Sequence, residues 1–143
     1  MGDPHELNRF LVGQAPVYDV ALAEIRAGQK QSHWMWFVFP QFAGLGTSPI
    51  SQHYAIKSVS EAEAYLRHPV LGPRLLECVE AVLGIEGRTA RQIFGAPDDA
   101  KLRSCATLFA HVSPPGSVFE RLLERYFPDG PDGRTLGAVG GPV

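Results

Sequence analysis

The sequence has few cysteines, little excess charge of either sign and no long apolar run. Its two cysteines, Cys78 and Cys105, show no spacing typical of a disulfide framework, and a free thiol in such apolar stretches behaves as a small hydrophobic side chain. The 13 Lys and Arg residues against 15 Asp and Glu give a net charge of −2. This balance argues against nucleic acid as a partner and gives no reason to expect a membrane surface as one.

The sequence also shows no pattern typical of a targeting or membrane-spanning segment. The longest apolar run, Trp34–Pro40, is too short to cross a bilayer. The first residues lack the charged and then apolar order of a signal peptide. We therefore expect a cytoplasmic protein.

Motifs of the common enzyme classes are absent as well. The chain contains no G-x-S-x-G, no H-E-x-x-H, no phosphate-binding P-loop and no G-x-G-x-x-G pattern. The five histidines stand apart without the spacing of metal ligands, so no metal site is predicted. No cofactor follows from the residues, and they leave open whether the protein is an enzyme.

What is present is the composition of an ordinary folded domain. The 143 residues are 45% hydrophobic and 20% charged, so residues 1–143 fit one domain with a core that needs no disulfide or metal. No repeat or linker divides the chain. The Gly- and Pro-rich residues from about 129 to 143 are expected to form a loose tail.

Glycine, proline and capping residues divide the chain into short amphipathic segments. Seven helices are predicted, as follows: Leu7–Gln14, about Val17–Ala27 with Gly28 after it, a helix from the capping box Ser60–Glu63 to near Arg67, Leu71–Leu83, Thr89–Phe94, one capped by Asp98, and one that starts with the capping box Ser117–Glu120. No strand alternation is clear. The predicted fold is therefore all-α or mostly α, a compact single-domain multi-helix bundle.

The dense apolar run His33–Pro40 fits either a buried strand or a buried helix. A lone strand would have no partner in this chain, so we prefer a helix that starts at about Lys30. The Gly-, Ser- and Pro-rich residues Gln41–Ser51 that follow are expected to form a loop without helical periodicity.

The first candidate site lies in residues 28–46, where polar residues, two tryptophans and a double-glycine loop follow one another. An indole offers a flat face and one N–H donor, and glycine lets backbone amides approach a ligand closely. The alternative is that both tryptophans fill the core while the polar residues start a solvated turn. Residue types alone favour that alternative. The candidate residues of this segment are Lys30, His33, Trp34, Trp36 and Gln41.

The second candidate site lies in the helix expected over residues 98–111. Arg103, Thr107 and His111 fall on one of its faces, and an arginine there is suited to bind an anion through its two-pronged guanidinium. The alternative is an exposed polar face with acidic residues at the helix start, as the helix dipole favours. The candidate residues here are Lys101, Arg103 and Ser104.

The stretch Ser32–Gln41, SHWMWFVFPQ, resembles a bacterial family of unknown function whose members often carry the label calpastatin. The resemblance extends from about Leu7 to Leu136 and includes Gly44-Leu45-Gly46, Tyr54-Ala55-Ile56, Ile93-Phe94-Gly95 and Lys101-Leu102-Arg103-Ser104. It implies a compact, mostly α-helical domain and favours a helix over residues 30–39. It implies no catalytic residues. True calpastatins are disordered inhibitors, unlike a chain with this folded composition.

We expect a small-molecule binding domain, with or without enzymatic activity, whose pocket lies between residues 30–46 and the helix over residues 101–111. A small anionic, nucleotide-like ligand suits the mixture of aromatic faces and fixed positive charge. Its ring would stack on Trp34 or Trp36, Lys30 and Arg103 would hold the anionic group, and His33, Gln41 and Ser104 would orient its polar edges. One alternative is a protein–protein interaction module that uses exposed aromatics near residues 36–46. In another, every such aromatic is buried.

Overall fold

Ten helices account for the regular structure of residues 2–140, the part of the chain that this computed structural model describes. In chain order they are α1 (Asn8–Gln14), α2 (Tyr18–Arg26), α3 (Met35–Val38), α4 (Pro49–His53), α5 (Val59–Arg67), α6 (Leu71–Leu83), α7 (Ala90–Phe94), α8 (Asp98–His111), α9 (Val118–Tyr126) and α10 (Gly133–Val139). The described residues contain no strand beyond one isolated bridge between Phe42 and Ile56. The predicted all-α single domain is confirmed.

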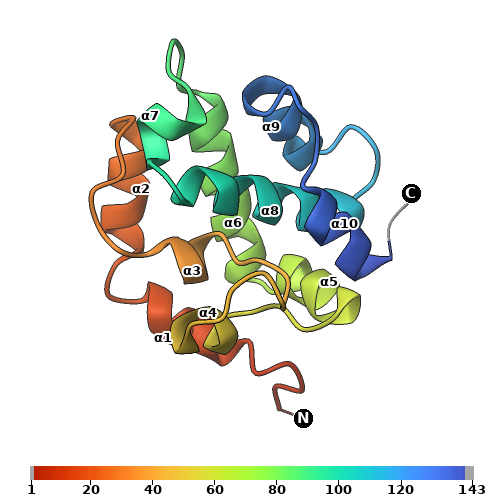
Figure 1. Ribbon diagram of the computed structural model, residues 1–143. Helices are drawn as coiled ribbons and strands as arrows, with labels where there is room; N and C mark the ends of the chain where they lie inside the picture. The colour runs from red at the N-terminus through yellow and green to blue at the C-terminus, as the bar shows by residue number, and fades with distance from the viewer. Residues whose placement is uncertain (1, 141–143) are drawn as a thin grey trace.

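Helix α8 crosses the middle of the molecule, and α5, α7, α9 and α10 all pack against it (Figure 1). From Leu102 to Phe109, every residue except Arg103 is buried. A helix buried on most of its surface must pair its polar side chains inside the fold. The Thr107 hydroxyl accordingly donates to the Arg103 carbonyl at 2.8 Å and accepts the Asp132 N–H at 2.9 Å.

Helix α6 provides the second half of the core, because α2, α5 and α9 pack around it. Its buried face contains Leu71, Leu75, Val79 and Val82, the apolar stripe that the sequence predicted. Cys78 on the same face and Cys105 on α8 are buried free thiols. Burial raises the pKa of the Cys78 thiol to about 12, and burial also raises the pKa of Cys105 well above its usual range. Both cysteines therefore act as apolar core residues, as the sequence indicated.

The apolar run contains a helix rather than a strand, but its predicted start at about Lys30 is wrong, because residues 29–34 are not helical and α3 covers only four residues. The Glu24 carboxylate on α2 determines this path. It accepts the backbone N–H groups of Gln31 and Ser32, the Ser32 hydroxyl and the Trp34 indole N–H, at 2.5–3.0 Å. These four hydrogen bonds to one charged group hold residues 31–34 against α2 in a path that is not helical.

One predicted capping box is displaced by two residues. Both Ser58–Glu61 and Ser60–Glu63 have the S-x-x-E pattern, but the hydroxyl that accepts the Glu61 N–H at 3.0 Å belongs to Ser58. Glu61 in turn accepts the Lys57 N–H. The helix therefore starts at the first of the two overlapping motifs.

The start of α8 also differs from the prediction. Asp98 is the first residue of α8 rather than its cap, since the N-cap position belongs to Pro97. The Asp98 carboxylate instead pairs with the ammonium groups of Lys30 and Lys101. By contrast, Ser117 of the predicted capping box supplies the N-cap side chain of α9 where expected. The helix predicted over Thr89–Phe94 is capped by Thr89, in a capping box with Gln92 that sequence reasoning missed.

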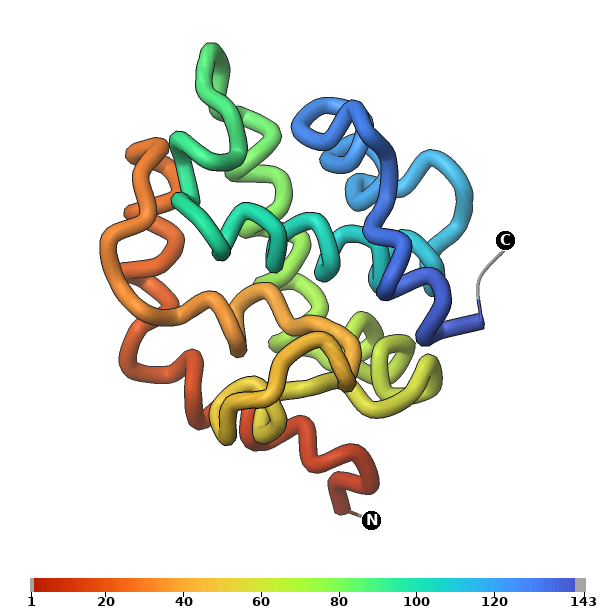
Figure 2. The backbone as a smooth tube through the Cα atoms, in the orientation of Figure 1, coloured from red at the N-terminus to blue at the C-terminus, as the bar shows by residue number. Residues whose placement is uncertain are grey.

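Two segments expected to be irregular contain a helix. Within the loop predicted at Gln41–Ser51, Ser48 caps α4, and within the tail predicted from about residue 129, Asp132 caps α10. Thr135 of α10 is fully buried, so this helix is packed on the domain. Residues 141–143 of the predicted tail lie outside the described residues. Figure 2 shows the segment over residues 41–57 folded back on itself beside α1.

We predict that Gly72→Ala destabilises the fold by more than about 2 kcal/mol, because overpacking against rigid backbone is expensive. A Cβ at Gly72 would lie 2.1 Å from the Leu66 carbonyl oxygen, at the tight junction of α5 and α6. Gly137→Ala in α10 is the matched control, since nothing lies within 4 Å of its Cβ. It should stabilise the protein slightly through helix propensity. Urea unfolding measures both variants, and equal effects would contradict the close approach.

Candidate functional site

A small cavity of about 180 Å³ lies between α3 and the segment that follows it. Its lining comprises Trp36, Gln41–Gly46, Ser51, Gln52, Tyr54, Ala55 and Lys57. The wall is mostly apolar, with a few polar groups and no Asp or Glu. A concave apolar site with a few polar groups is the usual form of a small-molecule site, although this cavity is smaller than most.

The cavity exists because residues 41–57 close into a loop. The Ala43 N–H donates to the Ile56 carbonyl, and the Ile56 N–H donates to the Gln41 carbonyl, both at 2.8 Å. Gly46 is needed inside this loop, since a Cβ there would lie 2.7 Å from the Ser51 hydroxyl oxygen. The ring of Tyr54 packs against Phe37 on α3 with centroids 5.2 Å apart, which fixes the loop to the core.

Gln41 is a buried polar residue of the cavity whose side chain lacks a partner in the described structure. It is only 8% exposed, and its side-chain amide makes no hydrogen bond with any residue from 2 to 140. Every fully buried side-chain nitrogen or oxygen in that range has a partner, so the Gln41 amide atoms keep some accessible surface, and Gln41 lines the cavity. A buried amide without a partner is costly to the fold unless water or a ligand satisfies it.

The Gly-rich part of the wall has unpaired backbone donors. The N–H groups of Gly44, Leu45 and Gly46 donate to no described residue. Gly44 has a φ of 94°, a conformation that favours glycine. Successive free N–H groups beside a cavity provide a partial positive charge that suits an anion.

Two cationic side chains lie at this loop. Lys57 lines the cavity, is exposed and forms no ion pair within residues 2–140. Arg134 of α10 places a guanidinium nitrogen 3.5 Å from the Gly44 carbonyl oxygen. The cavity wall therefore has positive charge at its rim and no acidic side chain to oppose it.

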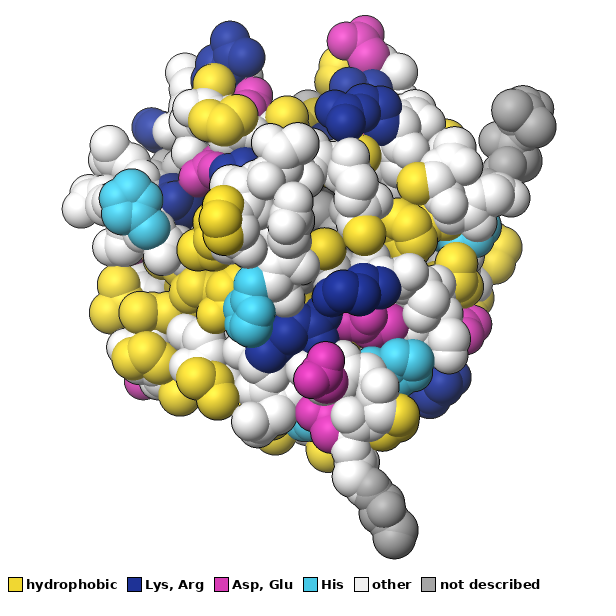
Figure 3. Space-filling model, turned by 60° about the horizontal axis from the view of Figure 1, so that its bottom comes forward, with side chains coloured by type: hydrophobic (Ala, Val, Ile, Leu, Met, Phe, Trp, Pro, Cys, Tyr) yellow, Lys and Arg dark blue, Asp and Glu magenta, His cyan; other side chains and the backbone are white. Residues whose placement is uncertain are grey.

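Lys57 also borders a second hollow, on the face shown in Figure 3, where charged and histidine side chains gather. At its centre the Arg9 guanidinium pairs with the Glu61 carboxylate at 2.6 Å. Arg9 also donates to the carbonyls of His5, Glu6, His53 and Ala55. Because its donors are already used, Arg9 supports the loop rather than offering a binding group.

Trp36 and Gln41 are the predicted site residues that meet at the cavity. Trp36 is half-buried, and the Lys101 ammonium lies 4.0 Å from the centroid of its ring. Lys101 also pairs with Asp98 at 3.0 Å. Lys101 therefore covers one face of Trp36 from α8 without lining the cavity itself.

Trp34 is a core residue, because it is 1% exposed and its ring packs against Phe39 and Phe94. Lys30 is also used inside the fold. Its ammonium donates to the Ser32 carbonyl at 2.6 Å and pairs with Asp98 at 2.8 Å. Burial alone would raise the pKa of Asp98, but the hydrogen bonds from Lys30 and Lys101 outweigh it and lower the pKa. The ion pairs join the 28–34 segment to the start of α8.

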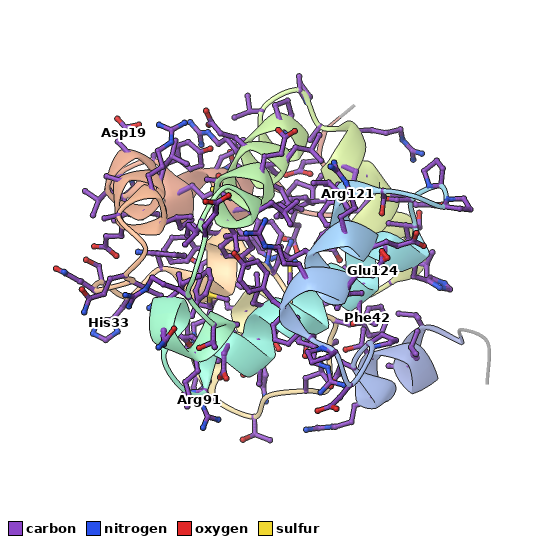
Figure 4. All side chains as sticks on the ribbon, turned by 90° about the horizontal axis from the view of Figure 1, so that it is seen from above. Asp19, His33, Phe42, Arg91, Arg121 and Glu124 are labelled. Atoms are coloured by element: carbon purple, nitrogen blue, oxygen red, sulfur yellow. The ribbon has the colours of Figure 1, made fainter. Side chains whose placement is uncertain are left out.

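The other predicted residues do not reach the cavity. Arg103 donates to the carbonyls of Gly130 at 2.7 Å and Pro131 at 3.1 Å, so it holds the segment before α10. Ser104 is buried and donates to the Ala100 carbonyl. His33 is exposed at the edge of the molecule (Figure 4). The Arg103 guanidinium is therefore engaged within the fold, and the cavity that Trp36 and Gln41 line includes neither Lys30 nor Arg103.

A wider groove of about 780 Å³ lies between α9 and α10, with α8 behind it. Leu123, Phe127 and Leu136 give it an apolar wall, and Glu120 and Glu124 of α9 lie along it. Figure 4 labels Glu124 on this helix. The buried polar group at the groove, the Thr107 hydroxyl, already has both of its partners in the fold.

Sequence reasoning missed Tyr54 and Lys57 as residues of the cavity. The signal for them is non-local, because the backbone pairing of residues 41–43 with Ile56 brings these side chains to the cavity. It also missed Glu24, whose four accepted hydrogen bonds direct the chain toward α3. In residues 2–140, no group of three or more His, Cys, Asp or Glu side chains is placed to hold a metal ion. No helix in that range is long and apolar enough to span a membrane.

These observations define a class of protein, an all-helical single domain with a small, partly polar cavity beside a Gly-rich loop. The chain belongs to the family described as protein of unknown function DUF1810, whose model matches residues 4–139. That description names no activity and does not mention calpastatin, so nothing here supports the calpastatin label.

A solved structure shows the same fold. The chain is similar to the conserved hypothetical protein Rv1873 from Mycobacterium tuberculosis, with 49% sequence identity and a TM-score of 0.95. The similarity covers 98% of this chain and 100% of that one. A comparison with curated proteins gave no match.

We predict that Glu24→Gln lowers the free energy of unfolding at neutral pH by about 1–3 kcal/mol, because a carboxylate with four donors is replaced by an amide. Burial favours the protonated carboxyl, but the hydrogen bonds from Ser32, Gln31 and Trp34 outweigh it and lower the pKa to about 2. This stabilisation is complete above the ordinary pKa of 4.5 and is lost as the pH falls toward about 2.

Urea unfolding between neutral and acidic pH tests this dependence on Glu24. The difference between wild type and Glu24→Gln should shrink below about pH 4.5. Glu80→Gln, at an exposed position of α6, is the control and should show a small difference that changes little with pH. A difference for Glu24→Gln that stays constant down to the lowest pH would contradict the assignment.

Proposed function

We propose that this protein binds a small molecule through the Trp36–Gln41 cavity, with a flat polar group inside and an anionic group at the rim. The observation that carries this proposal is Gln41, a residue that is only 8% exposed, that lines the cavity and whose side-chain amide has no partner among the described residues. A fold keeps such a group at a cost to stability, and ligand binding is a reason to keep it.

The size and wall of the cavity support a single ring as the group that enters. An apolar protein cavity of about 150 Å³ is sufficient to hold benzene. The cavity volume of about 180 Å³ is close to this. The half-buried Trp36 indole provides an aromatic wall. A larger, nucleotide-like ligand would insert its ring and leave the remainder outside.

The charge at the rim supports an anionic group on the same ligand. The free N–H groups of Gly44–Gly46 lie beside Lys57, and Arg134 is next to the Gly44 carbonyl. Anions bind well where backbone N–H groups and a cation act together. Lys57 and Arg134 thus take the role that the sequence pattern gave to Lys30 and Arg103.

A protein–protein interaction module based on exposed aromatics receives less support. Trp36, Phe37 and Phe42 are half-buried, and Phe37 packs against Tyr54. The exposed large hydrophobic residues are found at separate positions of the chain instead, as follows: Val12, Val20, Ile50, Val70 and Leu76. Single exposed hydrophobic residues are normal on protein surfaces.

A thermal-shift screen of nucleotides and phosphorylated ring metabolites tests the proposal, since a ligand of the folded state raises the melting temperature. For a compound that binds, Trp36→Leu should weaken binding about tenfold by removing the aromatic wall. Lys57→Ala should weaken it by about two- to fivefold, as expected for an exposed charge.

Arg121→Ala is the matched charge control, because Arg121 is exposed on α9 and does not line the cavity. Its affinity should equal that of the wild type. The proposal is refuted if no anionic ring compound shifts the melting temperature, or if Lys57→Ala and Arg121→Ala lose affinity equally. Circular dichroism and the melting temperature without ligand establish that each variant is folded.

A further inference from the structure

We infer that the part of the ligand that binds the Gln41 side chain is a carboxamide or lactam group. Such a group has a hydrogen-bond donor beside an acceptor along one edge. This inference rests on the proposed function and adds the chemical class of the group that enters the cavity. Its basis is the chemistry of the one buried side chain there that has no partner.

A primary amide offers both kinds of hydrogen-bonding group at one edge. Its oxygen accepts a hydrogen bond and its nitrogen donates one. The oxygen and the nitrogen of a ligand amide are about as far apart as those of Gln41. A ligand edge with one donor and one acceptor can therefore satisfy Gln41 with two parallel hydrogen bonds. A ligand edge with two acceptors or two donors can make only one of these two hydrogen bonds. Its other group would lie next to a Gln41 atom of the same partial charge.

The remaining wall excludes a charged edge at this position. No Asp or Glu lines the cavity, so an amidinium or ammonium group would enter without a counter-charge. Two polar side chains of this wall are already engaged, because the Ser51 hydroxyl donates to the Ser48 carbonyl and the Gln52 amide to the Thr47 carbonyl. A carboxylate buried beside Gln41 would have one side-chain donor there and would be better placed at Lys57.

Trp36 restricts the shape of the group that carries this edge. Because the Lys101 ammonium covers one face of its ring at 4.0 Å from the centroid, only the rest of the indole is available to a ligand. A flat ring that bears an amide edge can contact the indole and Gln41 together. The cavity of about 180 Å³ limits that group to a single ring.

Three probes of nearly the same shape test which kind of edge binds at Gln41: benzamide, benzamidinium and benzoate. They share the ring and differ in their edge, which has one donor and one acceptor, two donors, or two acceptors. We expect benzamide to bind the wild-type protein about three- to tenfold more tightly than either charged probe. Titrations followed by ¹H–¹⁵N NMR give the affinities. The side-chain NH₂ signal of Gln41 and the indole N–H signal of Trp36 locate the binding.

Substitutions of Gln41 should change the order of the probes in a defined way. Glu at this position offers two acceptors, so Gln41→Glu should bind benzamidinium most tightly, by about tenfold over benzamide. Gln41→Met keeps the size and removes both hydrogen bonds, so the preference for benzamide should disappear. Gln29→Glu introduces the same charge at an exposed position that does not line the cavity and should leave benzamide preferred.

The outcomes distinguish this inference from the proposed function. Equal affinities for the three probes, with the Trp36 signal shifting in each titration, would overturn the amide edge while leaving a ring-binding cavity. An unchanged order in Gln41→Glu would also overturn it. If none of the probes shifts the Trp36 or Gln41 signals, the inference is wrong whatever the anion screen shows. Matched circular dichroism spectra confirm that the variants are folded.

Discussion

The burial of α8 is the constraint on which the rest of the structure depends. Four other helices pack on it, and the residues from Leu102 to Phe109 are buried except for Arg103. Because nearly every face is covered, the polar side chains of α8 need partners inside the fold. Arg103 and Thr107 find these partners in the chain just before α10, and Lys101 finds them in Asp98 and Trp36. Polar residues that suggest a ligand site thus join parts of the fold.

Electrostatic contacts around the 28–34 segment separate the roles of the two tryptophans. Glu24 fixes the Trp34 indole, and Asp98 fixes Lys30, so the segment enters α3 along a path that is not helical. Trp34 is the residue just before α3 and lies in the core, whereas Trp36 lies within this short helix and lines the cavity. The short helix therefore connects the core directly to the site.

Local signals in the sequence predicted much of the fold. The stripe on α6, the cap at Ser117 and the left-handed Gly28 are recognisable because neighbouring residues produce them. Longer-range effects were not predictable in this way. The non-helical path of residues 29–34 depends on a carboxylate of the preceding helix. Tertiary hydrogen bonds thus set the path of the polar residues before the apolar run, and the helix forms only within the run itself.

The candidate site likewise combines residues that local sequence signals indicated with residues that only long-range contacts bring there. Its aromatic and amide residues, Trp36 and Gln41, stood out by residue type, and the glycines beside them indicated a close backbone approach. Lys57 and Tyr54 did not stand out, because the closure of the 41–57 loop is what brings them to the cavity. Sequence patterns also counted Lys30 and Arg103 as free charges, whereas buried carboxylate and carbonyl partners engage them.

The two buried cysteines give this protein a built-in reporter of its motions. Cys78 and Cys105 lie on α6 and α8, the two helices that form the core, and both thiols are shielded from solvent. A thiol reagent can reach them only when these helices separate, and a thiolate forms readily only in water. The rate of chemical labelling of the native chain therefore measures how often its centre opens. Any molecule that holds the core closed will slow this labelling, without the need to introduce a probe.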